Sequence, residues 1–205
     1  MIHAYHLIWG TYGFWMPNDP RGSWSDFVAS WELLRFGKPS RSIERSDVDY
    51  DQWEAWRSSA RESLKYPAVT LSGVQARAVA RGFAKGVQKS RFCIWACSIL
   101  PEHVHLVIGR HRYAVEKISN LLKGEATKQL MKESLHPQTP FAKNGRAASP
   151  WARGQWKLYL DSETAIEEAI HYVEQNPLKE GKPLQKWSFV TAFAGIPRSG
   201  WTTYY

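Results

Sequence analysis

Cysteine is scarce in this chain of 205 residues, where only Cys93 and Cys97 occur, both in one apolar segment. In an extended strand, residues four positions apart stand about 13 Å apart, beyond the ~7 Å between Cα atoms that a disulfide can bridge. A disulfide-stapled scaffold is therefore excluded. We expect two reduced core thiols, which favours a cytosolic protein.

Long apolar runs are missing as well. No stretch approaches the ~20 apolar residues of a membrane-spanning helix, and the first ten residues show neither a charged start nor a cleavage site. We expect a soluble, cytoplasmic protein without a membrane partner. Internal repeats are absent too, so we expect a single domain over 1–205 with an inserted helical arm at about 27–66.

Acidic residues are outnumbered in this sequence. The chain has 27 Lys and Arg against 19 Asp and Glu, a formal net charge of +8 and a pI near 9.5. Such an excess favours a polyanionic partner, of which nucleic acid is the commonest. Aromatic residues make up 14% of the chain, which is enough to leave stacking surfaces for unpaired bases besides the core.

Residues 92–109, FCIWACSILPEHVHLVIG, predict two apolar strands joined by a tight turn at 101–102. Side chains alternate along a strand, so His103 and His105 point the same way, roughly 6.5–7 Å apart. Two such imidazoles form half of a metal site. With seven histidines in the chain, an H-x-H is expected by chance in roughly one such sequence in four. The pair alone therefore leaves metal binding and an ordinary half-buried pair equally open.

Hydrophobic periodicity outside this stretch predicts four further elements. They are a strand at 2–11, a helix at 74–89, a helix at 114–133 and a strand ending the segment 151–160. The order strand, helix, strand, strand, helix, strand is that of an α+β, ferredoxin-like split βαβ fold, an antiparallel sheet with helices on one face.

A further helix is predicted from about Glu163, and Pro177 is expected to stop it. At 100° per residue, Tyr172 and Asn176 lie together on the flank of this helix, one turn apart. A tyrosine in such a place is usually half-buried packing. From the pattern alone, that ordinary interpretation holds.

A basic stripe runs along the helix at 74–89. Arg77, Arg81, Lys85 and Lys89 recur every four residues with no acidic partner between them. Like charges at this spacing repel one another, so the stripe is either a solvated face or a track for phosphates. The sequence leaves both open.

Two motifs together resemble a known family. The strand-turn-strand with P-E-H-V-H-L-V-I and the later H-Y-V-E-Q-N-P resemble the HUH-type single-tyrosine transposases, in particular the REP-associated tyrosine transposases and transposase A of simple insertion sequences. The matching stretches cover about half of the chain and are 4–11, 92–109, 114–128 and 151–177. The resemblance implies an antiparallel sheet with a C-terminal helix that carries the tyrosine.

The resemblance also implies a chemistry. His103, His105 and Asn176 become ligands of a divalent metal, Mg²⁺ or Mn²⁺, and Tyr172 becomes the nucleophile. The enzyme would cleave and rejoin single-stranded DNA hairpins, at palindromic repeats or element ends, through a 5′-phosphotyrosine intermediate. It would act near the bacterial nucleoid, with a homodimer as one arrangement. Candidate DNA contacts are Arg77, Arg81, Lys85, Lys89, Lys123 and Lys128 for the backbone, and Tyr12, Trp15 and Trp24 for stacking.

Glu102 departs from the family pattern, which often has Asn before the first histidine. Two alternatives stay beside the transposase. One is a domesticated hairpin-binding protein with little or no catalysis, and the other is an HUH nickase of replication or mobilisation.

Overall fold

The computed structural model describes residues 1–14 and 50–196, apart from the side chains at positions 50, 52, 53, 56 and 57. Trp15, Trp24 and the first part of the arm expected at 27–66 lie outside the described residues. The described part of the arm contains helix α1, Tyr50–Glu62. The single domain with an inserted arm stays a prediction.

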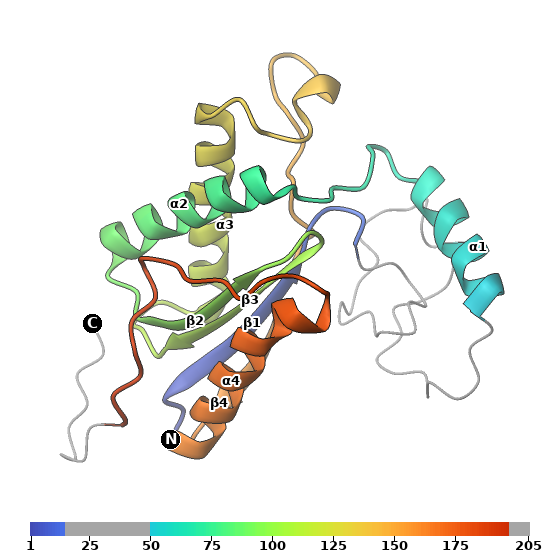
Figure 1. Ribbon diagram of the computed structural model, residues 1–205. Coiled ribbons are helices and arrows are strands. Elements are labelled where there is room, and N and C mark those ends of the chain that lie inside the picture. The colour runs from blue at the N-terminus through green and yellow to red at the C-terminus, as the bar shows by residue number, and fades with distance from the viewer. Residues whose placement is uncertain (15–49, 197–205) are drawn as a thin grey trace.

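A four-stranded antiparallel sheet forms the centre of the molecule (Figure 1). Its order is β2-β3-β1-β4, and along the described chain α1 and α2 come between β1 and β2 and α3 between β3 and β4. This is the ferredoxin-like split βαβ arrangement that the sequence predicts, and it is confirmed. The bounds are β1 Ala4–Gly10, α2 Gly73–Ser90, β2 Ile94–Ile99, β3 His103–Gly109, α3 Val115–Lys132, the 3-10 turn η3 Thr139–Phe141, β4 Trp156–Leu160 and α4 Glu163–Lys179.

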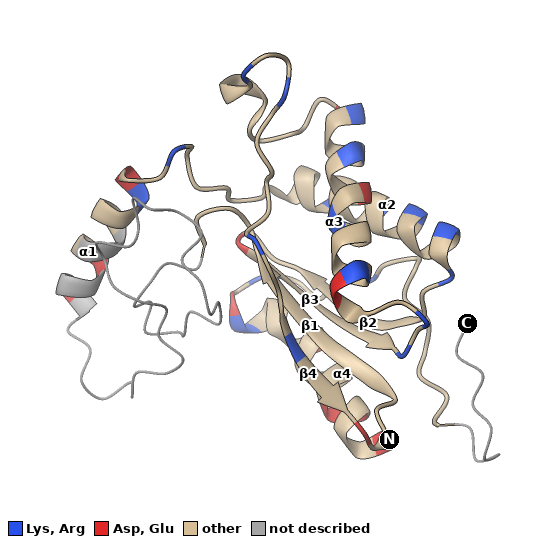
Figure 2. Cartoon of the chain, turned by 180° about the vertical axis from the view of Figure 1, so that it is seen from behind, with Lys and Arg blue, Asp and Glu red and all other residues tan. Residues whose placement is uncertain are grey.

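Alternation along the strands gives the sheet two apolar faces. Val104, Leu106 and Ile108 of β3 are fully buried in a core with α2 and α3. Val107 belongs to a second core, together with Val173 of α4. Figures 1 and 2 view the sheet from opposite sides and show α4 on the face away from α2 and α3. The C-terminal helix therefore covers the face that the split βαβ unit leaves open.

Helix α2 begins with a capping box. Ser72 accepts a hydrogen bond from the backbone N–H of Gln75, whose side chain accepts one from the N–H of Ser72. Its middle packs closely on α3, because a Cβ atom at Gly82 would lie only 2.5 Å from the Cα atom of Ala126. Glycine is thus required for this helix spacing.

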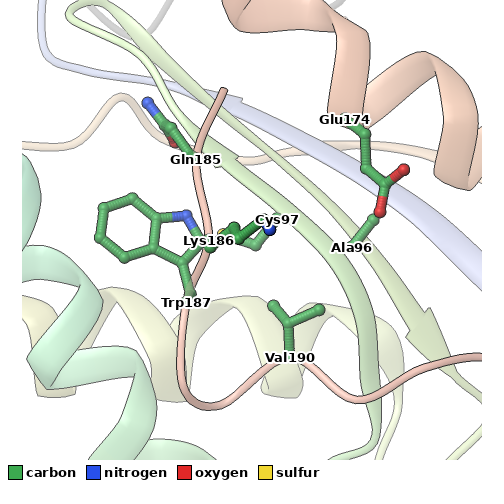
Figure 3. Close-up of a pocket in the computed structure, with 7 residues that line it drawn as sticks. All are labelled: Ala96, Cys97, Glu174, Gln185, Lys186, Trp187 and Val190. Atoms are coloured by element: carbon green, nitrogen blue, oxygen red, sulfur yellow. The ribbon is translucent and has the colours of Figure 1, made fainter. Parts of the chain in front are cut away.

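The segment after α4 runs along the edge of β2. The side-chain amide of Gln185 bonds both the N–H and the carbonyl of Ile99 at 2.8 Å, and Thr191 N donates to the carbonyl of Ile94 at 2.9 Å. These contacts satisfy backbone groups that an open sheet edge exposes. Figure 3 shows the pocket of about 270 Å³ that this segment closes with β2 and α4, lined in part by Glu174 and Trp187.

Both cysteines are free thiols, as the sequence predicts. Cys97 is buried, whereas Cys93 is exposed just before β2, so the expectation that both are core residues is wrong for Cys93. Within residues 1–14 and 50–196, no helix combines the length and the apolar character that crossing a membrane requires.

Candidate active site

Three imidazoles gather on the sheet face that α4 covers. His103 and His105 point the same way along β3, as alternation predicts, with ring centroids 4.9 Å apart. The register of β1 on β3 pairs Ile8 with His105, which places His6 diagonally opposite His105 on the same face. Strand pairing therefore brings together residues that lie 99 positions apart in the chain.

His6 and His105 contact each other through ring nitrogens. Nε2 of His6 lies 3.1 Å from Nδ1 of His105, and both residues are only 4% exposed. Burial lowers the pKa of His6 to about 4 and the pKa of His105 well below its ordinary value, because desolvation disfavours the charged imidazolium. Both rings are therefore neutral at pH 7 and keep lone pairs for a proton or a metal.

His103 is held between two groups from other parts of the chain. Its ring stacks on Phe14, with centroids 5.0 Å apart and planes 13° from parallel. Its Nε2 atom lies 3.6 Å from a carboxylate oxygen of Glu180, the residue that follows α4. The imidazole thus sits at the place where the loop after β1, strand β3 and the end of α4 meet.

Helix α4 presents the candidate nucleophile. Ser162 caps its start by accepting a hydrogen bond from the backbone N–H of Ala165. Tyr172 lies on the flank of the helix, as predicted, and is 43% exposed. Its ring centroid is 5.8 Å from that of His105 and 5.7 Å from that of His6. The phenol therefore lies beside the imidazoles while remaining open to a substrate.

Asn176, one turn after Tyr172 on α4, is buried, with 6% exposed. The expected helix stop at Pro177 is wrong, because α4 continues through it to Lys179. Proline has no backbone N–H, so α4 loses one hydrogen bond in its last turn. The carbonyl of Pro177 accepts hydrogen bonds from the N–H groups of Glu180 and Lys182, which closes the end of the helix.

The continued helix brings a cation to the tyrosine. Lys179 follows Tyr172 by seven residues, close to two full turns, and therefore returns to the same side of α4. Its ammonium nitrogen lies 4.2 Å from the centroid of the Tyr172 ring. Both side chains border an open hollow of about 610 Å³ on the outer side of the helix, together with Gln175 and Leu178.

The donor set fits a divalent metal. Two imidazoles and one amide supply nitrogen and oxygen ligands. In the described part of the chain, no three His, Cys, Asp or Glu side chains are grouped to hold an ion. Asn176, the third ligand that the family resemblance implies, is an amide whose buried Nδ2 atom has no hydrogen-bond partner among the described residues.

The basic stripe of α2 faces α3 rather than open solvent alone. Three of its members contact polar side chains of α3, and Figure 2 shows the charged positions along both helices. The pairs are Arg81 with Glu133, Lys85 with Gln129, and Lys89 with Glu125. Arg77 is exposed on the same helix, and Lys128 also pairs with Glu125. The stripe lies on the opposite side of the sheet from His103, His105 and Tyr172. A DNA strand would therefore have to pass round the sheet to contact both.

Two other residues that were expected to contact DNA, Lys123 and Tyr12, instead contact other parts of the chain. Lys123 is only 8% exposed and donates hydrogen bonds to the carbonyls of Ala152 and Gly154, at 3.2 and 2.5 Å. Tyr12 is partly buried against the main core, and its ring lies 6.2 Å from that of Tyr66. These contacts hold the segment before β4 and the loop after β1 in place.

His6 and Lys179 are the site residues that sequence reasoning missed. The alternating pattern of β1 puts His6 and Ala4 on one face, but only the pairing of β1 with β3 shows that His105 lies there. Helical spacing places Lys179 on the side of Tyr172 only if α4 continues past Pro177, as it does in the structure. The signal for His6 is long-range, whereas the signal for Lys179 is local.

No family model matches this chain, and no curated protein does. Among solved structures, it is similar to a REP-associated tyrosine transposase bound to a REP hairpin, with 13% identity, a TM-score of 0.45, and 96% of this chain and 92% of the other covered. It is also similar to a protein of Deinococcus radiodurans R1 described as a candidate transposase, with 14% identity, a TM-score of 0.38, and 89% and 92% covered. Because both likenesses are this remote, we base the function on the site's own residues.

Proposed function

We propose that this chain is a DNA-processing enzyme that breaks a phosphodiester with a tyrosine nucleophile and a divalent metal. More narrowly, we propose a single-tyrosine transposase that cuts and rejoins single-stranded hairpin DNA. One observation carries the proposal. Helix α4 holds a half-exposed Tyr172 beside the His103–His105 pair, with 5.8 Å between the rings of Tyr172 and His105.

Tyr172 would supply the covalent step. Its phenolic oxygen attacks the phosphorus, the bond from phosphorus to the 3′ oxygen breaks, and the 5′ phosphate stays on the tyrosine. The phenol loses its proton to solvent, and the departing 3′ oxygen takes one up. The ester bond in the intermediate conserves the energy for rejoining, whereas hydrolysis would lose it. A strand-transferring enzyme needs that property.

His103, His105 and Asn176 would hold the metal. When bound, Mg²⁺ or Mn²⁺ would polarise the scissile phosphate and stabilise charge on the departing oxygen. The protein's part is to keep two imidazole nitrogens and one amide on rigid elements, the sheet and α4. The apolar core of Val107 and Val173 between β3 and α4 fixes their relative position.

Lys179 would assist the nucleophile. A free tyrosine ionises near pH 10, so attack at neutral pH needs a group that favours the phenolate. The ammonium 4.2 Å from the ring of Tyr172 supplies positive charge there and to an incoming phosphate. Two unit charges about 4 Å apart attract each other by ~1 kcal/mol in water, so we expect Lys179→Met, which removes the ammonium beside the developing negative charge, to slow adduct formation up to about 5-fold. Lys179→Arg keeps the positive charge and should retain most of the rate. If Lys179→Met and Lys179→Arg form the adduct at the same rate, the charge of Lys179 does not assist the nucleophile.

The test is a covalent adduct between the full chain and a labelled, single-stranded hairpin oligonucleotide in Mn²⁺ or Mg²⁺. We expect a denaturant-resistant adduct on the 5′ side of the cut that EDTA abolishes. Tyr172→Phe should bind the hairpin and form no adduct. Tyr159→Phe is the matched control, because Tyr159 is an exposed tyrosine of β4 at 53% exposure. Hairpin binding without any adduct in the unaltered chain would instead indicate a hairpin-binding protein that has lost the chemistry.

A further inference from the structure

We propose that His6 is a positioning residue that orients His105 as a metal ligand through its Nε2 atom. This inference rests on the proposed metal site of the previous subsection. It concerns a residue outside the two motifs, on a strand that contributes no ligand. The observation behind it is the 3.1 Å contact between Nε2 of His6 and Nδ1 of His105.

One proton lies between these two nitrogens. Two protons would place two N–H groups head to head, and none would leave two lone pairs in repulsion inside a buried site. The ring pair therefore has two arrangements. Either His6 donates from Nε2 and the proton of His105 lies on its own Nε2, or His105 donates from Nδ1 and its Nε2 carries a lone pair.

Only the second arrangement can bind a metal. A ring nitrogen that carries a proton has no lone pair to offer, so His105 must keep its proton on Nδ1. His6 is then the acceptor that holds that proton and fixes the angle of the ring. Histidine ligands commonly need such an outer partner, and its loss typically weakens metal affinity ~10- to 100-fold.

The packing around His6 supports this role. The two rings lie on neighbouring central strands, with centroids 5.3 Å apart, and Trp156 of β4 borders His6 on its other side with centroids 6.2 Å apart. Both strands are paired on both sides, so the register fixes the positions of the two Cα atoms relative to each other. The sheet therefore holds the two rings within reach of each other.

The experiment measures Mn²⁺ affinity by calorimetry on the full chain after removal of bound metal. We expect His6→Leu to bind at least 10-fold more weakly, because it has no acceptor. His6→Gln should stay within about 3-fold of the unaltered chain, because its amide oxygen can accept from Nδ1 of His105. His111→Gln is the matched control, a histidine that is 8% exposed and bonded to the carbonyl of Ser90. It should leave affinity unchanged.

A second readout is independent of any variant. In ¹⁵N-labelled, Mg²⁺-loaded protein, the His105 proton should lie on Nδ1, with a nitrogen–nitrogen coupling to Nε2 of His6 across the hydrogen bond. A proton on Nε2 of His105, or no coupling, would overturn the inference even if His6→Leu failed to fold.

The failures can be told apart. If the unaltered chain binds no Mn²⁺, the proposed metal centre fails and the inference falls with it. If the unaltered chain and folded His6→Leu bind Mn²⁺ equally, only the role of His6 fails. If His6→Gln is as weak as His6→Leu, hydrogen-bond acceptance by this side chain is not what supports the ligand.

Discussion

Replacing Lys123 by Met tests whether this lysine is buried in the folded chain rather than available to bind DNA. The sequence places Lys123 among candidate DNA contacts, whereas the structure buries it under the segment before β4. There its ammonium donates to the carbonyls of Ala152 and Gly154. A charge held in this way cannot reach a phosphate. It should instead govern how the stability of the folded chain depends on pH.

The size of this effect follows from the pKa of Lys123. Burial lowers it to about 8 from the ordinary 10.5, because the ammonium is desolvated. Between these two values the unfolded chain binds more protons here than the folded chain, so the free energy of unfolding rises with pH. A pH unit is worth about 1.4 kcal/mol, so this interval of about 2.5 units corresponds to roughly 3 kcal/mol.

The assay is urea unfolding of the unaltered chain and Lys123→Met at several pH values from 7.5 to 10.5. The difference in unfolding free energy should shift in favour of the unaltered chain by roughly 3 kcal/mol across this window. Hairpin affinity and its salt dependence should not change. Lys128→Met, from an exposed position of the same helix, controls for the removal of a lysine. A difference that stays flat with pH, or a loss of hairpin affinity, would refute the burial of this charge.

Two further predictions concern the contact between α2 and α3. Gly82→Ala would place a Cβ 2.5 Å from the backbone of Ala126 and should destabilise the chain by ~1–3 kcal/mol in thermal unfolding. Gly124→Ala, with nothing within 4 Å of the added Cβ, should be neutral or stabilising by up to ~1 kcal/mol; equal losses would contradict the close approach. Arg81→Ala combined with Lys85→Ala should reduce the salt slope of hairpin binding by clearly less than the ~2 expected of two phosphate contacts. A full reduction would show that these side chains leave α3 for DNA.

The elements that carry the site could be predicted because their signals are local. Apolar strands flank the turn at 101–102, and alternation alone places His103 and His105 on one face. Helical periodicity gives α2, α3 and α4 to within a few residues. Residue spacing also puts Tyr172 on a helix flank. Each of these inferences uses fewer than 20 neighbouring residues.

What could not be predicted depends on contacts between distant segments. The contact of His6 with His105 requires the register of β1 on β3, and these two residues lie 99 positions apart in the chain. The basic stripe of α2 looks unpaired in its own helix, yet Glu125 of α3 and Glu133, which follows α3, approach it in space. Local composition cannot reveal a partner that only the tertiary fold supplies.

The most direct measurement locates the covalent bond to DNA. After reaction of the unaltered chain with a hairpin oligonucleotide and Mn²⁺, trypsin and nuclease should release the peptide 158–179 with an added nucleotide phosphate. This peptide contains both Tyr159 and Tyr172, so fragment ions can assign the bond. We predict the added mass on Tyr172 alone. Attachment to Tyr159, to another residue, or to none under conditions in which the strand is cut would contradict the proposed nucleophile.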